Sequence, residues 1–249
     1  MKIGAHRINL DLVDSTNQYL MALLPTQPIE GTIVMANHQY AGKGQRNANW
    51  ESNAGENLTF SLLLKPHFLP ISKLFYLNKI ISLSIVETLL SILEYTFAEL
   101  NIKWPNDVLI NKRKVAGILI ENQLLGDKLD ACVIGIGLNI NQRIFSSKIL
   151  ETACSVIQFT KHQLHLEPIL QSLLSNIEKN YELLEQNRWA IIDHYYLDCL
   201  FRFQEWADFQ RDNEIFKGMI IGVTKDGRLA VLRGQKVEYY DFKEISFVI

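Results

Sequence analysis

The chain has 249 residues, which suits one large domain or a medium domain followed by a small one. Hydrophobic residues make up 48% and charged residues 21%, a composition typical of a soluble globular protein. The net charge of −2 excludes a global positive field that would favour nucleic acid, so any anion site has to be local.

The cysteines and the apolar segments indicate a reducing, cytoplasmic setting. Cys132, Cys154 and Cys199 are widely spaced and form no C-x-x-C pair, so neither a disulfide framework nor a zinc site is indicated. The N-terminus lacks the apolar core of a signal peptide. The most apolar stretch, residues 80–93, contains Glu87 and is too short to span a bilayer. We therefore expect a cytoplasmic protein.

The first part of the chain mixes helix and strand signals. Good N-cap residues beginning at Asp14 precede an apolar-periodic run, which predicts a short helix. A β-rich run predicts a strand that ends near Gln39, and residues 41–56 have the composition of a loop. Residues 57–64 read as the next strand. Apolar residues at helical spacing over 71–98 predict one long helix or two.

A hairpin is predicted next. Residues 101–124 read as strand, turn and strand, with the tip at Asn111-Lys112-Arg113 and with Pro105 interrupting the first strand. A further apolar strand over 130–141 runs into a glycine and asparagine turn, and helices should return over roughly 167–202.

From about residue 206 the sequence pattern changes from helical spacing to short β runs. Short β runs are split by Asp226-Gly227 and by Arg233-Gly234, a spacing that suggests a small β-barrel-like C-terminal domain. We therefore place a domain boundary between 1–203 and 204–249.

The stretch AGKGQRNANW, residues 41–50, has features of an anion-binding loop. Its glycines let backbone N–H groups approach an anion closely, and Lys43 and Arg46 could neutralise charge. It is not a Walker motif, and the dinucleotide fingerprint is incomplete. Taken alone, the loop fits either a phosphate site or a solvated, flexible segment.

Other candidate residues are equally open when they are taken singly. Strand alternation predicts that Lys114, Ala116 and Ile118 share a face, where the lysine could meet a ligand anion or water. The alternate glycines of GIGLNIN, residues 135–141, fit close approach of a ligand or of another backbone, or tight packing alone. Trp50 and Trp104 fit either the core or a base-stacking role, and no nucleophile motif accompanies His38.

The order of these segments is more specific than any one of them. S-T-N from Ser15, then QYAGKGQRNANW, then KWPNDVLINKRKVAGILIE, then GIGLNIN resembles the biotin–protein ligase family over nearly the whole chain. K-W-P-N-D followed by K-x-A-G-I-L-x-E is the most specific part. The resemblance implies an α+β fold: a mixed sheet with helices, related to class II aminoacyl-tRNA synthetases, followed by a small SH3-like β-barrel.

The resemblance also implies a two-step reaction and its partners. Biotin and ATP would give biotinyl-5′-AMP, with Mg²⁺ shielding the phosphates, and a lysine of a biotin carboxyl carrier protein of acetyl-CoA carboxylase would then accept the biotin. Exposed edge strands of the sheet offer a docking place for the carrier. Some relatives carry an N-terminal DNA-binding domain; S-T-N begins here at residue 15, so we expect a ligase that is not a repressor. We expect no DNA and no membrane partner, and a monomer or weak homodimer.

The site residues carried over by the resemblance fall into groups. The biotin group comprises Ser15, Thr16, Asn17, Gln39, Lys43, Gly44, Gln45, Gly117 and Lys114. The ATP or adenylate group comprises Lys43, Gln45, Arg46, Trp50, Asn57, Lys114 and Asn139, and Gly135 and Gly137 would line the pocket floor. The catalytic group comprises Lys114, Asp107, Lys43 and Arg46, with Asp107 also as the metal ligand. Lys114 would bridge the biotin carboxylate and the α-phosphate.

The loop departs from the family pattern. The basic residue usual at Gln45 is missing, and Lys43 stands where arginine is usual; lysine cannot form a bidentate fork with phosphate. We therefore expect a loop that holds the adenylate less tightly than is typical. Two alternatives stay open: a lipoate or octanoate ligase or transferase of the same superfamily, and a non-catalytic biotin-sensing module.

Overall fold

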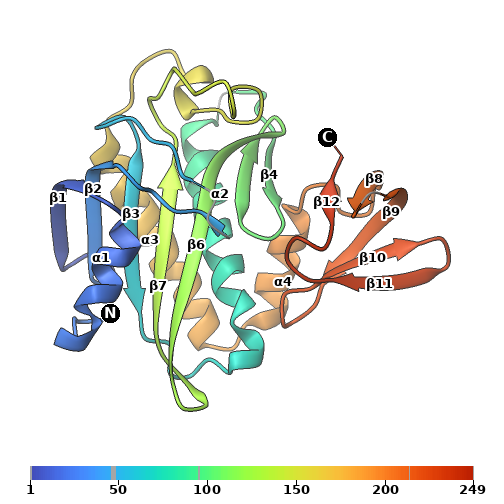
Figure 1. Ribbon diagram of the computed structural model, residues 1–249, viewed down its shortest axis with the longest axis horizontal. Coiled ribbons are helices and arrows are strands. Elements are labelled where there is room, and N and C mark those ends of the chain that lie inside the picture. The colour runs from blue at the N-terminus through green and yellow to red at the C-terminus, as the bar shows by residue number, and fades with distance from the viewer. Residues whose placement is uncertain (1, 46–48, 95, 213, 249) are drawn as a thin grey trace.

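The computed structural model describes residues 2–45, 49–94, 96–212 and 214–248. They form a seven-stranded mixed sheet in the order β1-β2-β3-β7-β6-β5-β4 and a five-stranded sheet in the order β11-β10-β9-β8-β12. The predicted α+β class is confirmed. Figure 1 shows the large sheet beside the smaller, C-terminal one.

The elements follow the predicted order. The large sheet consists of β1 (Arg7–Val13), β2 (Ile33–Gln39), β3 (Leu58–Leu64), β4 (Leu100–Lys103), β5 (Asp107–Ile110), β6 (Arg113–Leu125) and β7 (Lys128–Leu138). The helices are α1 (Thr16–Leu23), α2 (Phe75–Ile92), α3 (Leu166–Glu185) and α4 (Trp189–Asp198), with short 3-10 turns at Leu24–Thr26, Ile71–Lys73 and Val156–Gln158. The predicted cap is present, since Ser15 accepts from the Gln18 N–H. The segment 71–98 contains one α-helix, which ends at Ile92.

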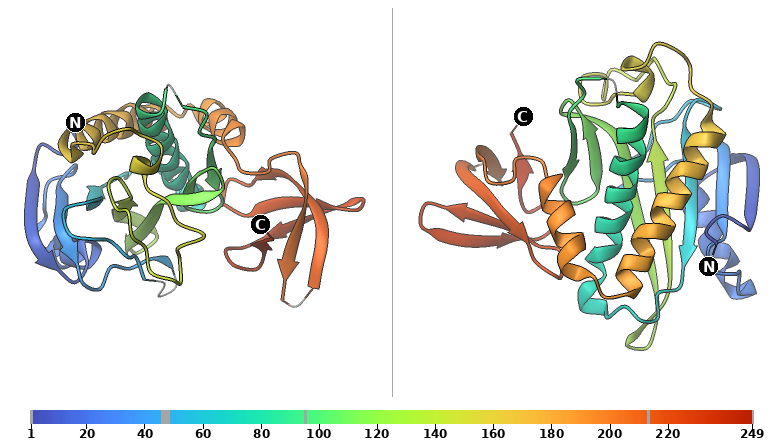
Figure 2. Two further views of the ribbon diagram at one scale, coloured as in Figure 1. Left: turned by 90° about the horizontal axis from the view of Figure 1, so that it is seen from above. Right: turned by 180° about the vertical axis from the view of Figure 1, so that it is seen from behind.

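Helices α2, α3 and α4 lie on one face of the large sheet, as the view from behind shows (Figure 2), and α1 lies on the other face (Figure 1). The segment Ile71–Ile92 is long and apolar enough to cross a membrane, but 72% of it is buried inside the protein. It packs against α3, α4 and three strands of the sheet, and is thus a core helix. That position accounts for an apolar sequence with little amphipathic pattern.

Alternation along β7 separates the helical core from the opposite face. Cys132, Ile134, Ile136 and Leu138 join the main core, while Ala131 and Val133 pack with α1 in a second, smaller cluster. Since successive strand residues point to opposite faces, Gly135 and Gly137 continue the α1 face. Two side-chain-free positions therefore lie next to the N-terminus of α1.

A β-bulge corrects one prediction. Ala116 and Ile118 are buried in the helical core, but Lys114 lies on the opposite face with Gly117. The β5–β6 pairing shifts register there, because Val108 pairs with Ala116 while Leu109 pairs with Lys114. The extra residue, Val115, interrupts the alternation, so the lysine does not share a face with Ala116.

The predicted hairpin tip is confirmed, and Pro105 does more than interrupt a strand. Asn111 and Lys112 take left-handed conformations at the tip, with φ of 48° and 67°. Around Pro105, which follows a cis peptide bond, the chain reverses so that β4 pairs antiparallel with β5. One predicted strand is thus two.

The outer edge of β4 is partly occupied. The Ile102 N–H donates to the Cys199 carbonyl, and the Phe201 N–H donates to the Ile102 carbonyl. The expectation that edge strands are open for a partner therefore does not hold at Ile102, where the chain that leaves α4 already pairs.

The C-terminal sheet is antiparallel and open. It comprises β8 (Trp206–Arg211), β9 (Glu214–Val223), β10 (Leu229–Arg233), β11 (Lys236–Tyr240) and β12 (Ser246–Phe247). The predicted turns are present, and Gly227 and Gly234 have positive φ. The two edge strands are β11 and β12, so closure into a barrel stays a prediction.

One tryptophan joins the two sheets. Trp104 Nε1 donates to the Gly227 carbonyl at 2.8 Å, and its ring lies 5.4 Å from that of Phe242. Trp104 is buried. Of the two roles left open for it, the structure supports the core role.

A buried lysine ties α2 to α4 and gives a testable result. Lys79 Nζ lies 2.6 Å from Asp193 Oδ1, and the Tyr76 hydroxyl donates to the other carboxylate oxygen. Burial lowers the pKa of Lys79, and Asp193 opposes that shift. Asp193→Ala should destabilise the protein by about 2 kcal/mol, because it leaves a buried charge without its partner. Urea denaturation measures this.

The matched control is Asp198→Ala on the same helix. Asp198 is exposed and pairs only weakly with His194, at 3.5 Å. Its loss should change the free energy of unfolding by less than about 0.5 kcal/mol. Equal effects of the two variants would contradict the assignment.

Candidate functional site

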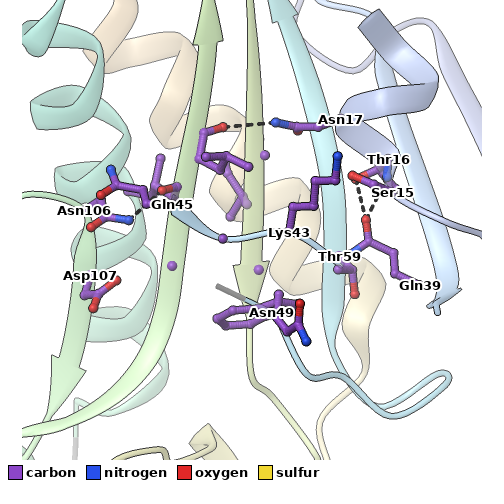
Figure 3. Close-up of a pocket in the computed structure, with 18 of the residues that line it drawn as sticks. Ser15, Thr16, Asn17, Gln39, Lys43, Gln45, Asn49, Thr59, Asn106 and Asp107 are labelled. Atoms are coloured by element: carbon purple, nitrogen blue, oxygen red, sulfur yellow. Dashed lines mark hydrogen bonds between the residues drawn. The ribbon is translucent and has the colours of Figure 1, made fainter. Parts of the chain in front are cut away.

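A cavity of about 220 Å³ lies on the α1 face of the large sheet (Figure 3). The loop from residue 41 and the ends of α1, β3, β5, β6 and β7 enclose it. Its lining includes most of the predicted site residues: Ser15, Thr16, Asn17, Gln39, Lys43, Gly44, Gln45, Trp50, Asp107, Lys114, Gly117, Gly135 and Gly137. Segments far apart in the sequence therefore meet as predicted.

Uncharged polar groups form one end of the cavity. Thr16 donates to Gln39 Oε1 from its backbone N–H at 2.7 Å and from its hydroxyl at 3.0 Å. The Ser61 hydroxyl lies 2.7 Å from Thr16 Oγ1 and 2.5 Å from Asn17 Oδ1. Asn17 Nδ2 donates to the Leu119 carbonyl and to Glu121. Amides and hydroxyls fixed in this way suit a neutral ligand head that both donates and accepts hydrogen bonds.

The glycines on β6 and β7 make room for these side chains. A Cβ on Gly135 would lie 2.5 Å from Asn17 Oδ1, and one on Gly137 would lie 2.3 Å from Trp50 Cε2. Of the meanings left open for GIGLNIN, the structure shows tight packing, because the side chains of Asn17 and Trp50, which line the cavity, fill the space over Gly135 and Gly137.

The loop folds back on itself beside this floor. The Trp50 N–H donates to the Gly42 carbonyl at 2.9 Å, and Lys43 pairs with Asn49 in an isolated β-bridge. With the Gln18 amide oriented to satisfy both of its groups, Lys43 Nζ donates to it at 2.7 Å. Gln45 lines the cavity. The predicted Arg46 lies outside the described residues, as do Asn47 and Ala48.

A lysine–carboxylate pair lies at the opposite end. Lys114 Nζ is 2.7 Å from Asp107 Oδ1, and 5.6 Å from the centre of the Trp50 ring. The Lys114 side chain is about one third exposed, so its ammonium can reach a ligand. The bulge at Val115 and the turn before Asp107 bring these two side chains together.

A second cavity of about 630 Å³ adjoins the first and shares Asn49, Trp50, Asp107 and Lys114 with it. Among the described lining residues of the two cavities, six cations face three carboxylates. The cations are Lys43, Lys103, Lys112, Arg113, Lys114 and Lys243, and the carboxylates are Glu51, Asp107 and Glu151. A chain of net charge −2 therefore concentrates positive charge here, which suits an anion.

Two predicted nucleotide residues are placed differently. Asn139 lines the second cavity, and its buried Oδ1 has no hydrogen-bond partner among the described residues. Asn57 lines neither cavity. Its amide donates to Gln142 and Ser52 and accepts from the Ile140 N–H, so it braces the strand ends behind the site.

Sequence reasoning missed four polar residues among the described lining of the first cavity. Asn106 lies within K-W-P-N-D, and donates to the Ile118 carbonyl at 2.8 Å. Thr59 alternates along β3 with residues of the helical core, so strand alternation could have predicted that it lies on the cavity face. Asn49 lies in the loop, opposite Lys43. Lys243 comes from the C-terminal sheet, and nothing in its local sequence indicated a site.

Arg7 and Lys103 lie in different surroundings. Arg7 Nη1 lies 2.8 Å from Glu167 and holds the pKa of that carboxyl below its usual range, so it ties β1 to α3. Lys103 lines the second cavity, and burial lowers the pKa of its ammonium. Within the described residues, no group of three or more His, Cys, Asp or Glu side chains forms a metal site.

The arrangement can place two ligands against one lysine. The smaller cavity offers uncharged hydrogen-bonding groups, the larger one offers positive charge, and Lys114 lies where they join. The fold and the site thus define a class of proteins that bind two small molecules side by side. One has an uncharged head group that forms hydrogen bonds, and the other carries negative charge.

Comparison with known proteins identifies the family. Residues 10–139 match the model of the biotin/lipoate A/B protein ligase family. The bifunctional ligase/repressor BirA of Escherichia coli is 30% identical over 246 residues, covering 95% of this chain and 72% of that protein. This chain belongs to the biotin/lipoate A/B protein ligase family.

A second relative and a solved structure agree. The biotin–[acetyl-CoA-carboxylase] ligase of Paracoccus denitrificans is 38% identical over 128 residues, 51% of each chain. The biotin protein ligase from Aquifex aeolicus, solved in complex with biotin and ATP, aligns with a TM-score of 0.80 at 27% identity, covering 97% of this chain and 98% of that one. The chain spans about half the length of the first curated relatives it matches, 54% of each of two Bacillus proteins.

Proposed function

We propose that this protein is an ATP-dependent biotin–protein ligase. It forms biotinyl-5′-AMP from biotin and ATP, and then transfers biotin to a lysine of a biotin carboxyl carrier protein. One observation carries the proposal: Lys114 and its partner Asp107 lie where an uncharged polar cavity opens into a cationic one.

The first cavity fits the biotin head. The ureido group of biotin is neutral and carries both donors and an acceptor, which match the Thr16, Asn17 and Gln39 groups at the polar end. The carboxylate at the other end of biotin would point to Lys114. The Aquifex ligase, which was solved with both biotin and ATP, supports this pairing of ligands.

In the first step, a biotin carboxylate oxygen attacks the α-phosphorus of ATP and pyrophosphate leaves. Both reactants are anions, so a cation between them lowers the cost of bringing them together. Lys114 supplies that cation, and Asp107 holds its ammonium in place. Mg²⁺ bound to the ATP phosphates would supply further charge shielding, and Asp107, which lines both cavities, is the carboxylate that would hold it.

In the second step, a carrier lysine amine attacks the acyl carbon of the mixed anhydride. An amide forms, AMP leaves and the amine loses a proton. The anhydride has to be kept from water until the carrier arrives, which is the task of the loop from Gly42 to Trp50. The Paracoccus relative, a biotin–[acetyl-CoA-carboxylase] ligase, supports a carrier that belongs to acetyl-CoA carboxylase.

The decisive experiment is transfer of labelled biotin to a carrier domain with Mg-ATP. Label on the carrier lysine is the expected result. Biotin binding without transfer would favour a biotin-sensing module. Calorimetry with biotin and with lipoate separates the remaining alternative, because a lipoate or octanoate enzyme would bind lipoate and not biotin.

Gln45, uncharged where the family usually has a basic residue, gives a further prediction. Gln45→Arg should slow escape of biotinyl-5′-AMP from the enzyme by about threefold to tenfold, because it adds a charged donor at the cavity wall. Rapid filtration of the enzyme–adenylate complex measures the escape rate. An unchanged rate would show that the missing charge at this position does not loosen the loop.

Several finer expectations belong to the same proposal. We divide the chain into a catalytic domain, 1–203, and an SH3-like domain, 204–249; the separate five-stranded sheet supports the division, and its closure into a barrel stays a prediction. We propose a cytoplasmic monomer or weak homodimer. The expectation that this protein is not a repressor stays a prediction. With β4 partly covered, β1 is the edge strand left for carrier docking.

A further inference from the structure

A lysine from the C-terminal sheet reaches the cavity of the catalytic sheet. Lys243 lies in the turn between β11 and β12 and lines the first cavity. Its Nζ donates to the backbone carbonyl of Gln45 at 3.4 Å, across 198 positions of sequence. Among the described lining residues of that cavity, it is the one contributed by the C-terminal sheet.

The turn that carries Lys243 is held firmly. The Glu244 N–H donates to the Asp241 carbonyl, and the Asp241 N–H donates to the Glu244 carboxylate. Phe242, the preceding residue, packs its ring against Phe75 and Trp104. The position of the Lys243 backbone is therefore fixed relative to the catalytic sheet.

The backbone of Lys243 is in an unfavourable conformation. Its φ is 68°, in the left-handed region that favours glycine. Residues with strained backbone conformations are enriched at functional sites, where the role of the side chain offsets the cost of the strain. Glycine would adopt this turn with less strain, so the presence of lysine here points to a role for its side chain.

Lys243 reaches the loop at Gln45, a position without charge. Gln45 is uncharged, and Lys43, the nearest described cation on the loop, is engaged with Gln18. Lys243 brings an ammonium to the Gln45 backbone from outside the loop. At Gln45 the loop therefore gains an additional cation and an anchor to the C-terminal sheet.

We propose that Lys243 is a positioning residue, a latch that holds the Lys43–Gln45 part of the cavity wall against the adenylate through the Gln45 carbonyl. This inference rests on the proposed ligase function. It assigns the C-terminal sheet a part in retaining the intermediate.

The sharpest test is Lys243→Gly, since glycine suits the backbone conformation and folding is not put at risk. The melting temperature should stay unchanged or rise, while biotinyl-5′-AMP escapes about threefold to tenfold faster, as expected for loss of one partly exposed charge-assisted hydrogen bond. Trypsin should also cleave the loop faster in the enzyme–adenylate complex. Lys243→Arg should restore most of the retention.

The matched control is Asp212→Gly. Asp212 also has a left-handed φ, 51°, in a turn of the same sheet, but it lines neither cavity of the site. Its variant should keep the wild-type escape rate. Wild-type escape from Lys243→Gly, or an equal effect of Asp212→Gly, would overturn the latch. Failure of wild-type protein to form any adenylate would instead overturn the ligase proposal.

Discussion

Replacing Lys114 with methionine should slow adenylate formation by about 100- to 1,000-fold while biotin still binds. The ammonium lies at the junction of the two cavities, 2.7 Å from Asp107, and is the cation placed to meet both reacting anions. Loss of one preorganised group of this kind typically costs that factor in rate. Biotin-dependent exchange of labelled pyrophosphate into ATP measures the step.

The control for this variant is Lys128→Met. Lys128 is exposed at the first position of β7, far along the strand from Gly137, and its replacement removes the same charge from the same sheet. The exchange rate of this variant should match the wild type. An exchange rate for Lys114→Met within about threefold of the wild type would show that Lys114 is not the cation that brings the two reacting anions together.

Replacing Gly135 with alanine should weaken biotin binding by about 10- to 100-fold. The new Cβ would lie 2.5 Å from Asn17 Oδ1. Asn17 cannot move away cheaply, because it is hydrogen-bonded to Ser61, to the Leu119 carbonyl and to Glu121. The loss corresponds to about 1.4–2.8 kcal/mol, and titration calorimetry measures it.

The matched control for Gly135→Ala is Gly222→Ala, in the C-terminal sheet. A Cβ added to Gly222 in β9 would meet no atom within 4 Å, so Gly222→Ala adds a side chain without a clash. Its biotin affinity should be unchanged. Wild-type affinity in Gly135→Ala would show that the Asn17 amide can shift without cost to the ligand.

Local signals predicted much of the fold because the relevant forces are local. The cap at Ser15, the apolar spacing of α2 and the turn at Asn111 each act within a few residues, and each prediction is confirmed. The bulge at Val115 was not predicted, because alternation assumes an unbroken register and the register is set by β5. That single extra residue decides on which face Lys114 lies.

The site was predicted from motif order more than from chemistry. Motif order assembled Thr16, Gln39 and Lys114 around one cavity, which single residues could not do. It assigned Asn57, which lines neither cavity, to the adenylate group, since a motif position does not show which way a side chain points. It could not find Lys243, because the contact with the loop exists only after two sheets pack together.

The packing of Trp104 has a mechanical consequence. Its indole is fixed to the C-terminal sheet through the Gly227 carbonyl, while Asp107, three residues later, holds Lys114 in the cavity. Pro105 and Asn106 between them form a short, braced connection. We therefore expect the orientation of the small sheet to set the position of Asp107 and, through it, the geometry of the lysine–carboxylate pair.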